Sequence, residues 1–213
     1  MKRKVLFLMA AALMMTAAAY SQVSFGLRAG VNFQNLNGED EAGDKLKNDL
    51  AIGFHIGANA EIPIAQDFYI QPGLLFSTKG ATNVYEVDDL KVSISYIELP
   101  IHFLYKPQLG SGKLIVGFGP YVGYGIGGKF KLNDEEEDIK FKNDVKETDE
   151  EAIYLRPLDA GADIFFGYEF AFKVSVQLNA QLGLLNLVPK YEGEKSDEIV
   201  KNTGFGFSVG YRF

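Results

Sequence analysis

The sequence predicts an all-β fold: an eight-stranded antiparallel up-and-down transmembrane β-barrel of the outer-membrane type. Apolar and polar residues alternate with a period of two through eight segments, and the apolar face of each segment carries no charged residue. The N-terminus has the form of a secretory signal peptide. The chain also ends on a strand of alternating aromatic residues, GFGFSVGYRF.

Composition excludes several other classes of protein. Of the 213 residues 47% are hydrophobic, too many for an intrinsically disordered chain. The mean hydropathy of -0.02 argues against a bundle of membrane helices, each of which needs an apolar run of about 20 residues. The absence of Cys removes disulfides, thiolate catalysis and cysteine-ligated metals. A net charge of -7 argues against nucleic-acid binding.

The first residues form an export signal. Lys2, Arg3 and Lys4 precede an apolar stretch over 5–19, and Ala-Tyr-Ser at 19–21 fits the small-x-small cleavage rule. A short membrane anchor is the alternative, but the stretch is too short to span a bilayer comfortably. We therefore expect a signal peptide over 1–21 and a barrel domain over 22–213.

The eight alternating segments predict the strands and their order. They cover residues 23–34, 52–62, 68–79, 96–105, 114–126, 158–168, 174–184 and 204–213. The connections alternate in length, with long ones at 35–50, 80–91, 127–152 and 189–203 and short ones at 63–67, 106–112 and 169–173. Long and short connections at opposite ends are typical of a meander.

A soluble barrel with its apolar face around a ligand would show the same alternation. Three features favour lipid on the apolar face. The polar face is rich in Gly, Ser and Asn, which suits a narrow interior better than a water-facing surface. Aromatic residues near the short connections predict an interfacial girdle: Phe68, Tyr69, Phe103, Tyr105, Tyr168, Phe170, Tyr211 and Phe213. The last strand resembles the assembly signal of outer-membrane barrels, carried by Phe205, Phe207, Tyr211 and Phe213.

Three irregularities qualify the pattern. Pro72, Pro100 and Pro120 fall inside strand segments, where we interpret them as bulges or bends. Val92 and Ile94 break the alternation, which indicates a bulge near Ser95 or a stretch that rises above the membrane. Residues 127–146 alternate weakly and predict a hairpin outside the membrane that extends the strands over 114–126 and 158–168; the alternative is a ten-stranded barrel.

Four stretches resemble a known family. YIQPGLLFSTKG (69–80), YIELPIHFLYK (96–106), VGFGPYVGYGIGG (116–128) and LDAGADIFFGYEF (158–170) are similar to the PorT-like outer-membrane β-barrel domain, often labelled "porin family". The resemblance covers essentially the whole chain after the signal peptide. It implies an outer-membrane eight-stranded barrel without catalytic residues. One member of that family belongs to a protein-secretion machine, and most have no assigned role.

The ionisable residues on the polar face are Arg28, His55, Glu61, Lys79, Glu98, His102, Asp159, Asp163 and Arg212. From them we predict a polar network in the lumen: Arg28, His55, Glu98, His102, Asp159, Asp163 and Arg212. The network fills a narrow interior or, alternatively, gates an ion path. The two histidines lie on strands separated by a third, so we expect no metal or catalytic pair and no cofactor. A serine–histidine lipid deacylase is a further alternative. Such an enzyme needs catalytic residues that lipid can reach, whereas both histidines point inward. We expect no enzyme.

Loops 35–50 and 127–152 are acidic and interleaved with lysines. They lack the spaced ligands of a calcium-binding loop, although weak binding of divalent cations stays open. We expect a multi-pass protein of the Gram-negative outer membrane, in contact with its lipid and with the barrel-assembly machinery. The predicted role is structural or interactive, with an extracellular or envelope protein partner at these two loops. The alternatives are a narrow channel and a component of a secretion machine.

Overall fold

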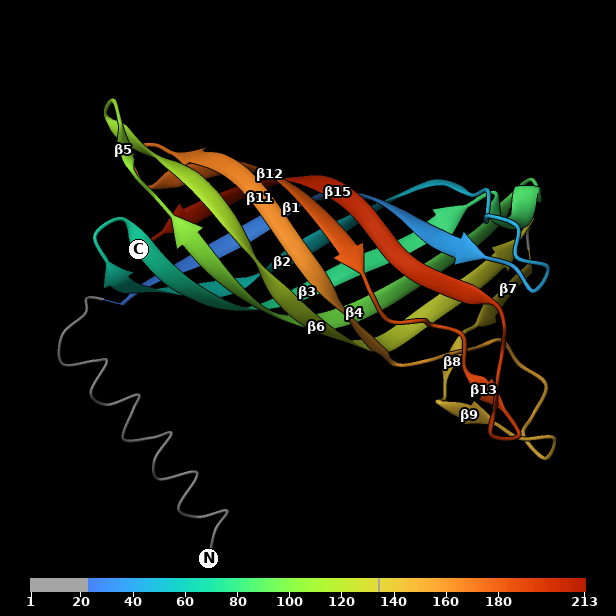
Figure 1. Ribbon diagram of the computed structural model, residues 1–213. Coiled ribbons are helices and arrows are strands. Elements are labelled where there is room, and N and C mark those ends of the chain that lie inside the picture. The colour runs from blue at the N-terminus through green and yellow to red at the C-terminus, as the bar shows by residue number, and fades with distance from the viewer. Residues whose placement is uncertain (1–22, 134) are drawn as a thin grey trace, which may run out of the picture.

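A computed structural model describes residues 23–133 and 135–213 (Figure 1). The predicted signal peptide lies outside the described residues. Eight long strands make up the molecule: β1 (Ser24–Glu39), β2 (Asp49–Ala65), β3 (Phe68–Thr82), β4 (Leu90–Tyr105), β6 (Gly112–Leu132), β11 (Leu158–Glu169), β12 (Val174–Gly183) and β15 (Ile199–Arg212). The shorter elements are η1 (Val84–Glu86), β5 (Gln108–Leu109), β7 (Glu135–Asp138), β8 (Lys140–Phe141), β9 (Asp144–Val145), β10 (Tyr154–Leu155), β13 (Lys190–Tyr191) and β14 (Glu194–Lys195).

The long strands form a closed antiparallel ring. Each pairs with the neighbour that precedes and the one that follows it in the chain, and β15 returns to pair with β1. That last ladder runs from the Gly26–Arg212 pair to the Glu39–Ile199 pair. Closure gives every strand two partners, which a sheet in lipid requires because lipid offers no hydrogen bonds to the backbone. The predicted eight-stranded barrel is confirmed, and the ten-stranded alternative is wrong.

The apolar face of the ring points outward. Large apolar side chains are exposed around the barrel, among them Ile52 (77% exposed), Phe25 (63%) and Ile164 (60%). The polar residues of the same strands point into the ring, where His55, Glu98 and Asp159 are buried. This is the arrangement of a transmembrane barrel and the reverse of a soluble one. No helix within the described residues is long and apolar enough to span a bilayer.

The two ends of the barrel differ. Turns after β2, β4 and β11 lie at one end together with the C-terminus, and they use left-handed backbone at Asp67, Gly110 and Lys173 (Figure 1). At the other end lie η1, β7, β8, β9 and β13, within the long connections (Figure 1). We call these the short-turn end and the long-loop end. The predicted alternation of short and long connections is confirmed.

Aromatic rings gather outside the short-turn end. Phe68 stacks on Tyr105 with centroids 4.8 Å apart, and Tyr168 and Tyr211 each meet a neighbouring phenylalanine edge-on, Phe170 and Phe213. This fits the predicted girdle. Tyr69 is the exception: its ring packs inside the barrel, against the buried cluster of Leu104, Ile115 and Phe165. Its position in the alternation, two residues before the inward Gln71, places it on the inner face.

The ladder irregularities do not lie at the prolines inside strands. The pairings on both sides of Pro72, Pro100 and Pro120 keep the same register, so the bulge interpretation of these residues is wrong. A register shift does occur between Ser95 and Tyr96, as predicted, but the extra residue lies on β6. β4 alternates without a break, and Val92 and Ile94 simply face inward.

A second irregularity interrupts the β2–β3 ladder. No residue pairs lie between Leu50–Ala81 and His55–Ser77, and the register shifts across the gap. The Thr78 hydroxyl partly replaces the backbone ladder: it accepts a hydrogen bond from the Phe54 amide at 2.8 Å. At this gap, which we call the Thr78 seam, a side chain therefore joins the two strands in place of continuous backbone pairing.

The long loops fold into an assembly with its own apolar core, which we call the loop core. Its buried residues come from strand ends and loops: Leu36, Ala81, Val84, Leu90, Val92, Ile94, Tyr96, Ile139, Leu187 and Val200. β1 and β6 extend beyond their predicted ends to Glu39 and Leu132, and β7 folds back on β6 as an antiparallel hairpin. The predicted hairpin is confirmed for β6 only, because β11 begins at Leu158 and takes no part in it.

The narrow ring leaves no room for a side chain at Gly30. A Cβ there would lie 2.2 Å from the Phe207 carbonyl oxygen and 2.5 Å from the His55 ring. We expect Gly30→Val to lower the free energy of unfolding by about 1–3 kcal/mol, the usual cost of overpacking. Urea unfolding in lipid vesicles, followed by circular dichroism, measures it. Ala29→Val, on the outer face one residue away, is the matched control. Equal stability of the two variants would contradict the close packing.

Candidate functional site: the barrel lumen

All seven residues of the predicted lumen network lie on the inner face of the ring. His55, Glu98, His102 and Asp159 are buried, and three others, Arg28, Asp163 and Arg212, are half-buried. They do not form one cluster. The structure divides them among three groups at successive depths, which the residues below define.

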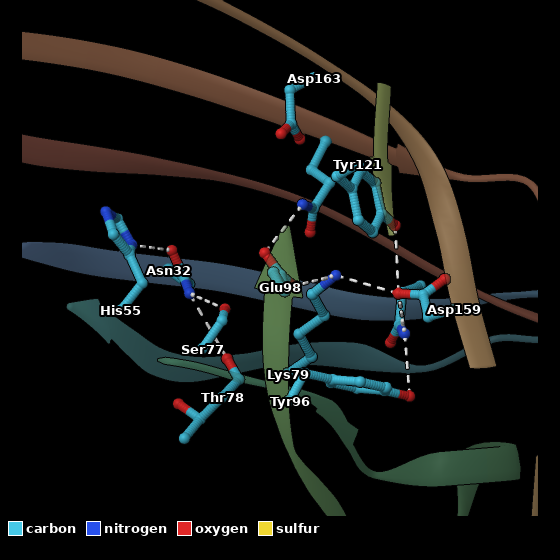
Figure 2. Close-up of polar contacts among 12 residues, drawn as sticks. Asn32, His55, Ser77, Thr78, Lys79, Tyr96, Glu98, Tyr121, Asp159 and Asp163 are labelled. Carbon is cyan, nitrogen blue, oxygen red and sulfur yellow. Dashed lines mark hydrogen bonds and ion pairs between the residues drawn. The ribbon is translucent and has the colours of Figure 1, made fainter. Parts of the chain in front are cut away.

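Lys79 is the centre of the group nearest the long-loop end. Its Nζ lies 2.7 Å from Glu98 Oε1 and 3.0 Å from Asp159 Oδ2, and all three side chains are almost fully buried (Figure 2). The ammonium also faces the Tyr121 ring, with 4.3 Å to its centroid. One cation thus lies between two carboxylates inside the ring, and each of the three charges has an opposite charge within 3.0 Å, as burial requires.

Hydrogen bonds extend this group across the lumen. The Tyr121 hydroxyl and the Asn202 amide both donate to Asp159 Oδ2, at 3.1 Å and 2.9 Å, and Asn202 also reaches the Tyr96 hydroxyl (Figure 2). Tyr96 and Tyr121 are among the largest fully buried side chains. Together these groups join β3, β4, β6, β11 and β15, so the network braces the ring from within.

The second group, at mid-depth, holds Arg28 and both histidines. The Arg28 guanidinium faces the Phe165 ring, with 5.9 Å from Cζ to the centroid. His102 Nε2 lies 3.0 Å from Asp163 Oδ2, while its ring meets Phe165 edge-on. His55 lies between the Asn32 amide oxygen at 2.7 Å and the Ser208 hydroxyl at 2.9 Å. These contacts fix the orientation of both imidazole rings inside the lumen.

The third group lies at the short-turn end and contains two residues that the sequence reasoning missed. Lys106 Nζ lies 2.9 Å from Glu61 and 2.7 Å from Glu169, and Arg212 donates to Glu61 at 2.6 Å. Lys106 and Glu169 had been assigned to short connections. Lys106 continues the inward alternation of Glu98 and His102, so extending that pattern by one step would have found it.

Little space is left between the three groups. Two cavities lie along the lumen, one of about 30 Å³ beside Arg28 and His55 and one of about 10 Å³ beside Glu61 and Arg212. Each has room for a water molecule or two. In the described residues, no group of three His, Asp or Glu side chains is arranged to hold a metal ion. Both cavities are far smaller than a typical small-molecule site.

Lysines accompany the acidic side chains of the long loops. Lys142 contacts Asp149 at 2.5 Å, Lys47 contacts Glu86 at 3.3 Å, and Lys129 pairs with a β7 glutamate. The hydrogen bond from Lys142 lowers the pKa of Asp149 below its usual value. These pairs are exposed for the most part, so they contribute little to stability.

A closed ring with lipid-facing apolar side chains and a charge-paired lumen defines the class of outer-membrane β-barrels. Residues 5–213 match the family of the outer membrane protein beta-barrel domain, and the chain belongs to this family. It is thus a protein of the Gram-negative outer membrane. In barrels of this class the longer loops lie outside the cell. No curated protein sequence matches the chain.

Solved structures of similar architecture share little sequence with the chain. Neisserial surface protein A is 12% identical, with a TM-score of 0.48 and coverage of 90% of this chain and 99% of that one. The attachment invasion locus protein Ail of Yersinia pestis, solved with the heparin analogue sucrose octasulfate, is 13% identical, with a TM-score of 0.43 and the same coverage. The N-terminal barrel of Pseudomonas aeruginosa OprF is 13% identical, with a TM-score of 0.39 and coverage of 91% and 99%.

Removing the central cation of the lumen should destabilise the barrel. Lys79→Met leaves Glu98 and Asp159 buried without their counter-charge, and we expect a loss of about 3–5 kcal/mol in the free energy of unfolding. Urea unfolding in lipid vesicles measures the loss. Lys129→Met, at an exposed pair, is the control and should leave the free energy of unfolding almost unchanged, because exposed ion pairs contribute little.

A triple variant tests whether the loss comes from unpaired charge. Lys79→Met combined with Glu98→Gln and Asp159→Asn removes all three charges, so part of the lost stability should return. If Lys79→Met alone unfolds like the wild type, the ion-paired group does not brace the ring.

Proposed function

We propose that this protein is a sealed outer-membrane barrel that acts through its extracellular loops, as a structural or interaction protein and not as a channel. The single observation that supports it is the division of the interior. Three ion-paired or hydrogen-bonded groups occupy the lumen, and the cavities between them hold about 30 Å³ and 10 Å³. The extended structure outside the membrane, by contrast, has a core of its own.

The narrow-channel alternative requires at least two of these groups to move together. An ion crossing the lumen would have to part Lys79 from its carboxylates and then Lys106 from Glu61 and Glu169. Breaking buried pairs of this kind costs several kcal/mol for each group. A place in a secretion machine is compatible with the proposal, because such a component would also act through its surfaces.

The contact surface that we propose comprises loops 35–50 and 127–152. This surface includes β7, whose four residues Glu135–Asp138 are acidic and exposed. Asp40 and Asp44 lie exposed or half-exposed in the loop between β1 and β2. A surface of this charge suits a partner with a basic face, since complementary charge speeds association and favours the correct partner.

Planar-bilayer recording tests the sealed lumen. We expect the refolded protein to show no steady conductance, and Arg28→Ala to show none either, because the Lys106–Glu61 pair stays closed below it. A sixteen-stranded porin in the same bilayer is the positive control, since its lumen is water-filled. Stepwise openings of the wild type at low voltage would refute the sealed barrel. Openings confined to Arg28→Ala would assign a gate to that residue.

A charge-matched pair of variants tests the loop surface. Glu135→Gln with Glu137→Gln removes two negative charges from β7, whereas Gln108→Lys with Ser111→Lys makes the same change in net charge at the short-turn end. Each variant, held in lipid nanodiscs, is incubated with an envelope extract. We expect a basic partner to bind the β7 variant about tenfold more weakly and the control unchanged. Equal binding to both would count against the loops as the contact surface.

A further inference from the structure

A cavity of about 560 Å³ lies at the extracellular end of the barrel, within the loop assembly. This volume falls in the range of small-molecule sites. Its apolar walls come from strand ends and from two loops, with Leu36, Val92, Phe130, Ile153, Leu155 and Val188 among the lining residues. Because these residues are far apart in the sequence, the cavity exists only when the whole assembly is folded.

The floor of the cavity is closed. Val92 lines it, and the next inward residues of β4 are Ile94 and Tyr96, both fully buried. Below them lies Glu98 with its partner Lys79. The cavity thus ends above the ion-paired lumen. A closed end of this kind suits a binding site, whereas the entrance of a pore would continue into the lumen.

The charged side chains at the cavity are mostly anionic. Three glutamates line it, Glu41, Glu194 and Glu198, against a single lysine, Lys195. The rings of Tyr85 and Tyr191 line it as well. Tyrosine faces attract cations, and carboxylates attract them more strongly.

The phenol of Tyr85 stays neutral at this site. Its hydroxyl donates a hydrogen bond to the Glu198 carboxylate, and the contact joins η1 to the loop before β15. Burial, followed by this hydrogen bond, raises the pKa of Tyr85 well above its ordinary value. The tyrosine therefore adds no negative charge, and the charge of the lining is that of the glutamates and the lysine.

We propose that the cavity binds a small amphiphile with an apolar body and one protonated amine. The apolar body occupies the walls of the cavity, and the amine lies among the glutamates. A carboxylate in place of the amine would be repelled by the same glutamates, which makes charge the basis of selectivity. The inference deepens the proposed function and rests on it, because it assigns a ligand class to the loops of a sealed barrel.

Two fluorescent probes of opposite charge test the inference. Dansylcadaverine carries a naphthalene body and an amine, and dansyl-aminocaproic acid carries the same body and a carboxylate. Each is titrated into the full chain in zwitterionic lipid nanodiscs, with the signal of empty nanodiscs subtracted. We expect saturable binding of the amine, at least about tenfold tighter than that of the acid.

Two variants, each with a matched control, identify the site. Val188→Trp fills the cavity and should weaken amine binding by about tenfold or more, while Val87→Trp, at an exposed position outside the lining, should not. Glu194→Gln with Glu198→Gln should bring the two probes to similar affinity, and the charge-matched Glu135→Gln with Glu137→Gln should leave the preference intact. Circular dichroism confirms that each variant is folded.

Several outcomes would overturn the ligand assignment. They are equal affinity for the two probes, a preference for the acid, no saturable binding, and binding that survives Val188→Trp unchanged. None of these outcomes bears on conductance, so a sealed barrel that ignores the amine leaves the proposed function standing. Conversely, a wild-type protein that conducts ions refutes the sealed barrel even if the amine binds.

Discussion

Closure of the ring by the β1–β15 ladder is the constraint on which the rest of the structure depends. Lipid supplies no partner to an unpaired strand edge, so the sheet must close. Eight strands enclose a narrow space, and its width limits which side chains the inner face can carry. A residue such as Gly30 is needed where a neighbouring backbone lies against the strand, and a charge such as Lys79 is admitted only with its counter-charges.

The interior changes character along its axis. From the short-turn end to Glu98, most inward residues are polar or charged, and the apolar cluster of Leu104, Ile115 and Phe165 lies among them. Beyond Tyr96 they become apolar and merge with Leu187 and Val200 in the loop core. The barrel thus carries a small folded unit above an interior that is mostly polar. In such an arrangement the barrel fixes the position of the loops.

Much of the fold was predictable because lipid makes the alternation strict. Ile52, Phe54 and Ile56 face outward without exception, and so the strands and the order of long and short connections could be taken from the sequence. Lumen residues such as Arg28 and Asp159 were found by the same rule, but their grouping was not, since alternation gives the face and not the register between strands. Val92 and Ile94 were interpreted wrongly as a break in the alternation, because an apolar residue on the inner face has no evident role until the loop core is known. Lys106 and Glu169 were missed because the predicted strands over 96–105 and 158–168 each end one residue before them.

The Thr78 seam between β2 and β3 has a mechanical consequence. Along most of the wall, a strand is held to its neighbour by successive backbone hydrogen bonds that share a lateral load. Between the Leu50–Ala81 and His55–Ser77 pairs the load passes through the Thr78 hydroxyl and its contacts with Phe54. A force that pulls the strands apart sideways would meet less resistance there than along a fully paired ladder. The seam is therefore a weak point of the wall.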